Sequence, residues 1–386
     1  MPWRTVGVRE QRVEFVVRMS RGEQSMAQLC RQFGITRPTG YRWWRRYLEQ
    51  GVAGIEERSR RPQHSPRRTA AELEQFVVVE RRRRPDWGAR KLRVLLERAG
   101  YPLPASTVHR ILVRHGLVRE ADRHPAATQR FERARPNELW QMDFKSPKGW
   151  EQPVGPLSVL DDHSRYAIAL AGTWSTRAEA VREQLMAAFT QCGLPKAMLM
   201  DHGSPWWNPQ APSGWTRLTV WLMKQGIRCS FSGYRHPQTQ GKVERFHAAL
   251  ERARRRRGLP VAGLRQAWLD QFRHEYNHLR PHEALGMRTP ASVWRKSERR
   301  YDPQPAAWEY PAGALVQRLS QKGQLKLAGR WWQISEALAE EWVQLVQLEQ
   351  RVLVYYCRSL LREINLADQR STAVDRWSHP YEVSEV

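Results

Sequence analysis

The sequence contains few cysteines and no apolar stretch long enough to cross a membrane. Its four cysteines, Cys30, Cys192, Cys229 and Cys357, are scattered without a CxxC pair, which argues against a disulfide framework and a cysteine-rich zinc module. No run of about 18 apolar residues occurs, and the N-terminal MPWRTVGVRE has no apolar signal segment. These absences exclude membrane-spanning and exported classes, so we expect a protein of the reducing cytoplasm.

Lysine is also scarce, because only nine of the 64 basic residues are lysines and the rest are arginines. Against 39 acidic residues they give a net charge of +25. A charge of this size favours a polyanionic partner, nucleic acid before an anionic membrane. The guanidinium group binds phosphate through two hydrogen bonds and can also recognise guanine, which suits DNA contact. An arginine-rich codon bias is an alternative explanation of the same composition.

The length of 386 residues predicts two to four domains, and we expect the first, residues 1–57, to be a helix-turn-helix domain. Met26, Leu29 and Phe33 share one apolar helix face, Gly34 ends that helix, and Thr36 can cap a second one. A basic helix after a short turn is typical of a motif that enters the DNA major groove. Its candidate DNA contacts are Arg37, Arg42, Trp43, Arg45 and Arg46.

A second helix-turn-helix domain is expected over residues 71–120, after a basic linker at 58–70. The segments WGARKLRVLLERAG and ASTVHRILVRHGL form its two helices, with Ser106 as the expected N-cap of the latter. Two such domains in tandem would recognise a longer DNA site than one. The alternative is a helical packing unit with a solvated basic face. The candidate DNA contacts here are Arg90, Lys91, His109 and Arg110.

The fold class is therefore expected to be multidomain, with an α/β domain at residues 136–300 after a linker at 121–135. Strands are predicted at 139–145, 157–160, 166–172, 197–200 and 227–231, and helices at 176–189, 217–224 and 242–257. A meander followed by alternating helices and strands predicts a mixed sheet. Short alternating strands predict a small closed β-barrel at 306–368, and residues 369–386 form a C-terminal tail.

Three acidic residues of the α/β domain have unusual surroundings. Asp143 interrupts a strand on the face opposite Trp140 and Met142, although strand interiors disfavour Asp. Asp201 follows the apolar strand AMLM, at a carboxyl end where ligand sites of open α/β sheets concentrate. Glu244, near the start of the long helix, is the next acid after Asp201 along the chain. Carboxylates that converge from different elements are typical of a magnesium or manganese site.

Each of these acids also has an ordinary explanation. Asp143 could be a charge on an edge strand, Asp201 could form a turn, and Glu244 could complement the helix dipole. The coincidence of all three in this order favours a single metal site. Phosphoryl transfer on DNA commonly uses two such ions, about 4 Å apart.

The motifs WQMDF, LDDHSRY, DHGSPW, HPQTQGKVERFH and YNHLRPHEAL resemble the catalytic core of bacterial insertion-sequence transposases. These enzymes belong to the DDE integrase-core superfamily and are related to retroviral integrases. The resemblance covers residues 136–294 and implies an RNase H-like fold. It also implies that Asp143, Asp201 and Glu244 are the Asp-Asp-Glu triad that binds two Mg²⁺ ions, for which Mn²⁺ can substitute.

One feature departs from the family pattern. The 42 residues between Asp201 and Glu244 exceed the usual spacing, and the segment PWWNPQAPSGW at 205–215 looks like an insertion that accounts for the excess. Because no other acid lies between these two residues, no rival glutamate exists at a shorter spacing. The triad assignment is therefore kept.

Other motifs have less specific interpretations. HEYNH at 274–278 matches the HExxH pattern of zinc proteases, but without a third ligand we expect phosphate contact or helix packing. Asp161 and Asp162 are expected to form a turn, with a supporting role beside the metal site as the alternative. Along the long helix, a solvated basic end is the alternative to DNA contact. The candidate DNA contacts there are Lys242, Arg245, His247, Arg254 and Arg255.

The resemblance implies a transposase that binds transposon-end inverted repeats in the bacterial nucleoid. Water would attack the transposon end to free a 3′-hydroxyl, which would then attack a target phosphate. Double-stranded DNA and at least a second copy of the chain are the expected partners, because two ends must be joined. A non-catalytic DNA-binding regulator or an inactive domesticated transposase is the alternative, but neither explains three carboxylates at motif positions. An RNase H-type nuclease would not need tandem recognition domains.

Overall fold

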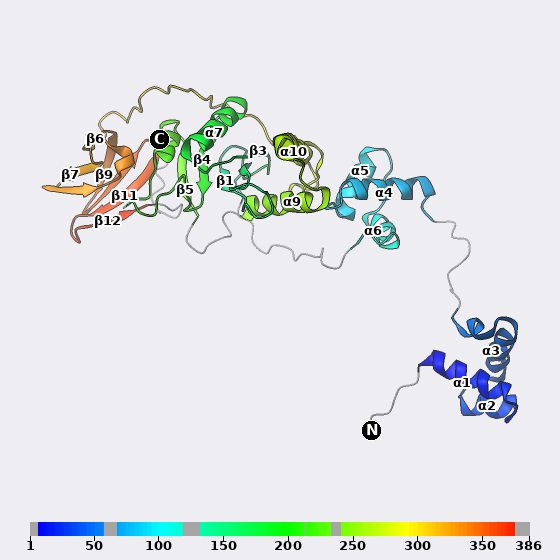
Figure 1. The fold of residues 1–386 in the computed structure, drawn as a ribbon. Helices are drawn as coiled ribbons and strands as arrows, with labels where there is room; N and C mark the ends of the chain where they lie inside the picture. Colours follow the sequence, from blue (N-terminus) through cyan, green and yellow to red (C-terminus); the bar gives the residue numbers. More distant parts are fainter. Residues whose placement is uncertain (1–6, 58–67, 119–131, 212, 233–240, 375–386) are drawn as a thin grey trace. The chain divides into compact units, whose positions relative to one another are not determined.

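A computed structural model describes residues 7–57, 68–118, 132–211, 213–232 and 241–374 (Figure 1). Most of the expected linkers at 58–70 and 121–135, and most of the tail at 369–386, lie outside these residues. The chain divides into two compact units, Met1–Thr69 and Ala70–Val386. In the described ranges, none of the helices combines the length and apolar character that crossing a membrane requires.

The first unit contains the expected helix-turn-helix. Its elements are α1 (Val8–Ser20), α2 (Met26–Gln32), α3 (Arg37–Gln50) and the 3₁₀ helix η1 (Gly51–Ile55). Gln28 accepts the Ser25 backbone N–H at 2.9 Å and so caps α2, and Gly34 adopts the left-handed conformation at the turn into α3. Gly40 allows α3 to lie against α2, because a Cβ there would meet the Cys30 sulfur at 2.5 Å.

The second unit begins with three more helices, α4 (Ala71–Arg83), α5 (Ala89–Arg98) and α6 (Ala105–Arg114). They pack around a separate apolar core that includes Trp87, Leu92 and Ile111. Helix α6 starts at Ala105, with Pro104 in the N-cap position. The expectation that Ser106 caps this helix is therefore wrong, because Ser106 lies inside the first turn.

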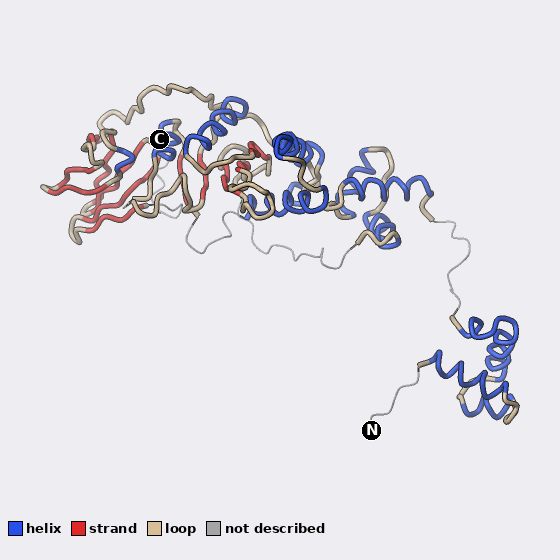
Figure 2. The backbone as a smooth tube through the Cα atoms, in the orientation of Figure 1, coloured by secondary structure: helices blue, strands red, loops and turns tan. Residues whose placement is uncertain are grey.

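The α/β domain has the mixed sheet that the sequence predicts. Its strands are β1 (Trp140–Phe144), β2 (Leu157–Asp161), β3 (Ala167–Ala171), β4 (Ala197–Met200) and β5 (Arg228–Phe231). They are ordered β3-β2-β1-β4-β5, with antiparallel pairing from β3 to β1 and parallel pairing from β1 to β5. Figure 2 colours the strands red and the helices blue. Strand β1 is thus central, and its carboxyl end lies beside the carboxyl end of β4.

Helices cover both faces of this sheet. Helices α7 (Ala178–Cys192) and α8 (Arg217–Lys224) share an apolar cluster with Trp140 and Met142. Helices α9 (Gly241–Arg257) and α10 (Arg265–His274) pack on the opposite face through residues that include Phe246 and Leu269. The alternation along β1 therefore directs Asp143 toward the α9 face, as the sequence predicts. Short segments follow α10: the π-helix η5 (Glu275–Leu279), the 3₁₀ helix η6 (Glu283–Leu285) and α11 (Pro290–Val293).

The C-terminal region is a sheet region without a closed barrel. Strands β6 (Leu315–Arg318), β9 (Trp342–Leu348), β10 (Arg351–Tyr356), β11 (Ser359–Asn365) and β12 (Arg370–Ala373) form an open sheet, while β7 (Gln324–Leu327) pairs with β8 (Arg330–Gln333). The predicted small closed barrel is not confirmed, because the strands of the described residues 315–373 form an open sheet. Val343 and Val354 instead share one cluster with Met223 and Cys229 of the α/β domain.

A buried ion-pair group joins the α4–α6 helices to the α/β domain. The Asp86 carboxylate, in the turn before α5, pairs with Arg280 and lies 3.7 Å from Arg257. Nearby, burial and the charge of Arg280 lower the pKa of Lys91 to about 7. Lys91 is thus partly desolvated at this contact, although its side chain keeps an intermediate exposure, and its DNA contact stays a prediction.

His282, beside the same contact, makes the stability of the protein dependent on pH. Its ring packs 4.7 Å from that of Tyr276, and burial, together with the charge of Arg280, lowers its pKa from 6.5 to about 2. Between these values the unfolded chain binds one more proton than the folded chain at this site. The stabilisation is therefore complete above pH 6.5 and is lost progressively as the pH falls.

We expect His282 to contribute up to about 1.4 kcal/mol per pH unit to the decrease in unfolding free energy between about pH 6 and pH 4. His282→Gln should remove this contribution, as measured by urea unfolding at several pH values. The matched variant His109→Gln changes an exposed histidine and should keep the wild-type slope. An unchanged slope in His282→Gln would contradict the assignment.

Candidate active site

Asp143 and Asp201 come together at one edge of the central sheet. In the parallel pair of β1 and β4, Gln141 is the partner of Leu199, and continuing this register by two residues sets Asp143 opposite Asp201. Burial and the negative charges of Asp201 and Glu244 raise the pKa of Asp143 to about 7. The acids thus lie close enough to repel one another.

One carboxylate oxygen of Asp201 is held by two donors. Its Oδ1 accepts the Gly203 backbone N–H at 3.0 Å and the Trp206 indole N–H at 2.6 Å. The Trp206 ring is 1% exposed and stacks on Phe144, with 5.4 Å between ring centroids. The sequence interpretation missed Trp206, although a tryptophan five residues after the candidate acid was a signal that could have been followed.

The first turns of α9 bring Glu244 and His247 to the same region. Glu244 is exposed, whereas His247 is buried, with Nε2 3.0 Å from Ser158 Oγ and Nδ1 3.7 Å from Asp143 Oδ2. Burial and the charge of Lys145 lower the pKa of His247 to about 3, so its ring is neutral near pH 7. This position corrects the expectation of a DNA contact, because the ring faces β2 and Asp143.

A cluster of buried polar side chains attaches the start of α9 to β1 and β2. The fully buried side chain of Asp162 pairs with Lys242 at 2.5 Å and accepts the Gln141 side-chain amide at 2.9 Å. Gln141 in turn accepts the backbone N–H of Val243 at 3.2 Å. These contacts position the turn that carries Glu244. They also correct the expectation that Lys242 contacts DNA, because its ammonium group is held inside the protein.

The two aspartates of the LDDHSRY motif have different roles. Asp161 forms the expected turn, since its Oδ2 accepts the Ser164 backbone N–H at 2.8 Å and hydroxyl at 2.6 Å. The side chain of Asp162 does not join this turn and pairs with Lys242 instead. The turn interpretation is therefore right for the side chain of Asp161 only.

The chemistry of the acids suits a hard divalent cation, although the triad is not gathered into a finished site. Within the described ranges, no three His, Cys, Asp or Glu side chains form a group able to hold a metal ion. Asp143 and Asp201 nevertheless offer the carboxylate oxygens that Mg²⁺ and Mn²⁺ prefer, and a cation between them would offset their repulsion. We therefore assign these two residues as the primary candidate ligands, with Glu244 as the third.

The basic C-terminal end of α9 is partly neutralised within the chain. Arg254 and Arg255 both pair with Glu251, at 2.6 and 2.7 Å. Arg255 and Arg245 remain exposed to solvent. The exposed pair keeps its predicted role as DNA contacts, whereas Arg254 is half-buried against Glu251.

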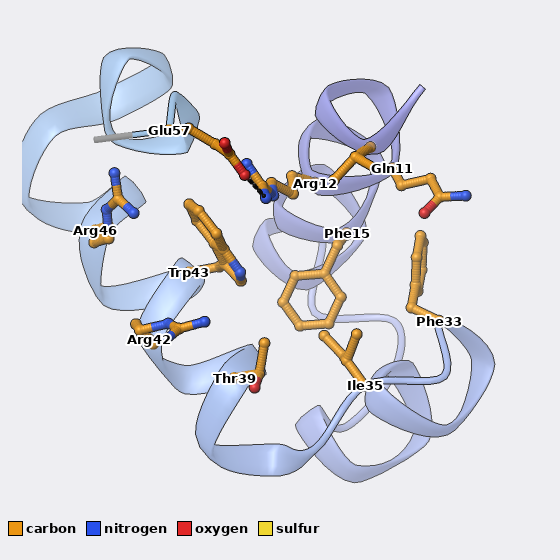
Figure 3. A pocket seen from close by; sticks show the side chains of 11 residues that line it. Gln11, Arg12, Phe15, Phe33, Ile35, Thr39, Arg42, Trp43, Arg46 and Glu57 are labelled. Carbon is orange, nitrogen blue, oxygen red and sulfur yellow. Dashed lines mark hydrogen bonds and ion pairs between the residues drawn. The ribbon is translucent and has the colours of Figure 1, made fainter. Parts of the chain in front are cut away.

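In the first unit, Trp43 lines a pocket between α1 and α3 (Figure 3). It is 9% exposed, and the guanidinium groups of Arg12, Arg46 and Arg42 lie 4.1, 4.5 and 5.7 Å from its ring centroid. Arg12 also pairs with Glu57 at 2.9 Å. The expected DNA contact by Trp43 therefore does not fit its burial, and the ring instead helps to hold α1 against α3.

The solvent-facing side of α3 is formed by residues one helical turn apart. Arg37, Tyr41 and Arg45 follow one another at a spacing of four, and all are exposed, as is the neighbouring Arg42. Tyr41 is 54% exposed and was not predicted as a contact, although the same spacing could have indicated it. Arg46, in contrast, donates to the Glu56 carbonyl at 2.7 Å.

On the second helical block, the predicted contacts separate by exposure. His109 and Arg110 on α6 and Arg90 on α5 are exposed, whereas Lys91 is partly desolvated. Arg90 also lies 3.4 Å from Glu283. The exposed residues of this block stay predicted DNA contacts.

The HExxH pattern at 274–278 does not form a zinc site within the described ranges. The rings of His274 and His278 stack with 4.7 Å between centroids, and His278 also meets the Tyr166 ring. These ring contacts indicate packing across the α10–η5 junction.

Comparison with known families finds helix-turn-helix models in the N-terminal part of the chain and integrase core models in its central part. Helix-turn-helix domain and homeodomain-like domain models match residues 11–63 and 39–112. Integrase core domain models match residues 133–237 and 225–290, which together include β1 to η6 and all three candidate acids.

Individual proteins also resemble parts of this chain. An uncharacterized protein of insertion element IS407 from Burkholderia multivorans is 26% identical over 64% of this chain and 88% of its own length. The transposase of transposon Tn552 from Staphylococcus aureus is 25% identical over 58% of this chain, which spans about half (52%) of that protein. The HTLV-2 integrase catalytic core domain, solved with magnesium, is 14% identical over 42% of this chain and 97% of its own, with a TM-score of 0.33.

The buried pair of Lys242 and Asp162 yields a test of the α9 attachment. Lys242→Met leaves the carboxylate of Asp162 buried without its cation, which should lower the unfolding free energy by about 3–5 kcal/mol in urea denaturation. Arg245→Met removes the same charge from an exposed neighbour and should change it by less than about 0.5 kcal/mol. Equal stability of Lys242→Met and wild type would show that the ion pair does not support α9.

Proposed function

Because the chain belongs, through its integrase core and helix-turn-helix domains, to the DDE integrase superfamily of insertion-element transposases, we propose that it cleaves and joins DNA. The observation that carries this proposal is the position of Asp143 beside Asp201 at the carboxyl ends of β1 and β4, where burial and, after it, the charge of Asp201 raise the pKa of Asp143 to about 7. Acids crowded at a sheet edge are unfavourable without a cation, so this arrangement supports metal-dependent phosphoryl transfer.

In the proposed reaction, Asp143, Asp201 and Glu244 would be the ligands of two divalent cations. Bound in this way, such ions acidify the nucleophile and stabilise negative charge on the phosphate and the leaving oxygen. Water first attacks the phosphodiester at the element end, and the bond to the 3′ oxygen breaks to leave a 3′-hydroxyl. That hydroxyl then attacks a target phosphate, loses its proton to solvent and displaces a target 3′ oxygen. Neutral His247 contacts Asp143 and adds no charge to the site.

Recognition of the element ends is proposed for the helix-turn-helix domains. The exposed face of α3, with Arg37, Tyr41 and Arg45, supports major-groove contact, because arginine can bind guanine through two hydrogen bonds. Exposed His109 and Arg110 on α6 would extend the recognised site. At least two copies of the chain would act together in the nucleoid, since two element ends are joined in one event.

The first experiment is a strand-transfer assay with purified protein, a labelled duplex that carries the element end, a target plasmid and Mg²⁺. Wild type should produce joined DNA, and Asp201→Asn should reduce joining to background while it still binds the duplex, because the amide cannot replace a charged ligand. Asp270→Asn makes the same change at a half-exposed position on α10 and should retain wild-type joining. Tight DNA binding by wild type without cleavage in Mg²⁺ or Mn²⁺ would favour a regulator or an inactive relative instead.

The recognition helix can be tested apart from the chemistry. Arg45→Ala should weaken binding to the element-end duplex by about 1–3 kcal/mol, as measured by fluorescence anisotropy. Arg9→Ala removes an exposed arginine of α1 that pairs with Glu56, and its effect should be much smaller. Equal losses of DNA affinity in the two variants would indicate a general charge effect and would argue against base recognition by α3.

A further inference from the structure

The segment after Asp201 is folded back on the acid that precedes it. In the 205–215 loop, Trp207 forms a β-bridge with Trp215, and its backbone N–H donates to the Gly203 carbonyl at 3.0 Å. The rings of Trp207 and Trp215 both pack on Phe231 at the end of β5. The loop is thus attached to the sheet on one side.

On its other side, the same loop presents Trp206 to the candidate ligands. The indole N–H lies 2.6 Å from Asp201 Oδ1, a short distance typical of a donor paired with a charged acceptor. The ring is 1% exposed and lies nearly parallel to Phe144, at an interplanar angle of 12°. Trp206 therefore contacts Asp201 directly and also contacts Phe144, the residue that follows Asp143.

We propose that Trp206 is a positioning residue whose indole N–H orients the Asp201 carboxylate for a divalent cation. This inference rests on the proposed function, because it assigns Asp201 as a ligand. The 205–215 loop, which lengthens the spacing between Asp201 and Glu244, is then a supporting element of the site.

The physical basis is the number of donors on each oxygen. Oδ1 accepts two hydrogen bonds, which fix both torsions of a short side chain and partly neutralise that oxygen. Both of these hydrogen bonds go to Oδ1 and neither goes to Oδ2, which is the oxygen that would bind a cation. Contacts of this kind to a metal-ligating carboxylate are typically worth about 10–100-fold in metal affinity or activity.

Packing explains why a tryptophan is needed here. Phenylalanine would keep most of the stacking on Phe144 but would lose the N–H donor. The matched position is Trp215, which is equally buried in the same loop and whose Nε1 has no hydrogen-bond partner among the described residues. A Phe substitution at Trp215 therefore removes an unused donor.

The test compares Trp206→Phe with Trp215→Phe in the full-length protein without DNA. Mn²⁺ binding is measured by electron paramagnetic resonance, and strand-transfer kinetics are measured separately. Trp206→Phe should raise the Kd for Mn²⁺ by about 10–100-fold and lower kcat, with little change in KM for the DNA. Trp215→Phe should match wild type in all three quantities, and the melting temperature of each metal-free variant verifies folding.

The possible results separate this inference from the proposed function. Wild-type Mn²⁺ affinity in Trp206→Phe, or an equal loss in Trp215→Phe, would overturn the role of the indole N–H while leaving the enzyme active. Absence of Mn²⁺ binding and joining in wild type would overturn the proposed function and this inference with it. If Trp206→Phe does not fold, Gly203→Ala is the second variant, because its Cβ would meet Asp201 Oδ1 at 2.8 Å and should weaken Mn²⁺ binding similarly.

Discussion

The repulsion between Asp143 and Asp201 is the unfavourable interaction that the rest of the α/β domain has to offset. Two carboxylates at the ends of adjacent parallel strands stay together only if the sheet and its surroundings hold them there. Burial and, after it, this unfavourable proximity raise the pKa of Asp143. The domain tolerates it because apolar clusters on both faces of the sheet stabilise the strands independently of the acids.

The polar contacts around the acids fix the orientation of their carboxylates. Trp206 and Gly203 donate to a single oxygen of Asp201. The Asp162–Lys242 pair and Gln141 hold the turn of α9 that carries Glu244. Buried polar groups are costly unless they are satisfied, so their concentration here indicates that geometry at this edge matters more than stability.

The interior of the protein also limits which basic residues can meet DNA. A net charge of +25 indicates a polyanionic partner, but it does not distinguish a solvated arginine from one that is paired or buried. Arg254 pairs with Glu251, and Lys91 is partly desolvated where the α4–α6 helices contact the α/β domain. The exposed cations that remain, such as those on α3, make a smaller and more specific set than the sequence suggested.

The sequence by itself determined the order of the helices and strands, the face of β1 that carries Asp143, and the candidate acids, because periodicity and local residue type depend on neighbours along the chain. It did not determine the open C-terminal sheet, the burial of Trp43 and Lys242, or the contact between Trp206 and Asp201. Those features depend on which surfaces meet after folding. A strand pattern is the same whether a sheet closes on itself or packs on another domain, and a lysine or tryptophan has the same local pattern whether it faces DNA or the interior. Only the tertiary structure decides between them, because burial and pairing are set by residues far apart in the sequence.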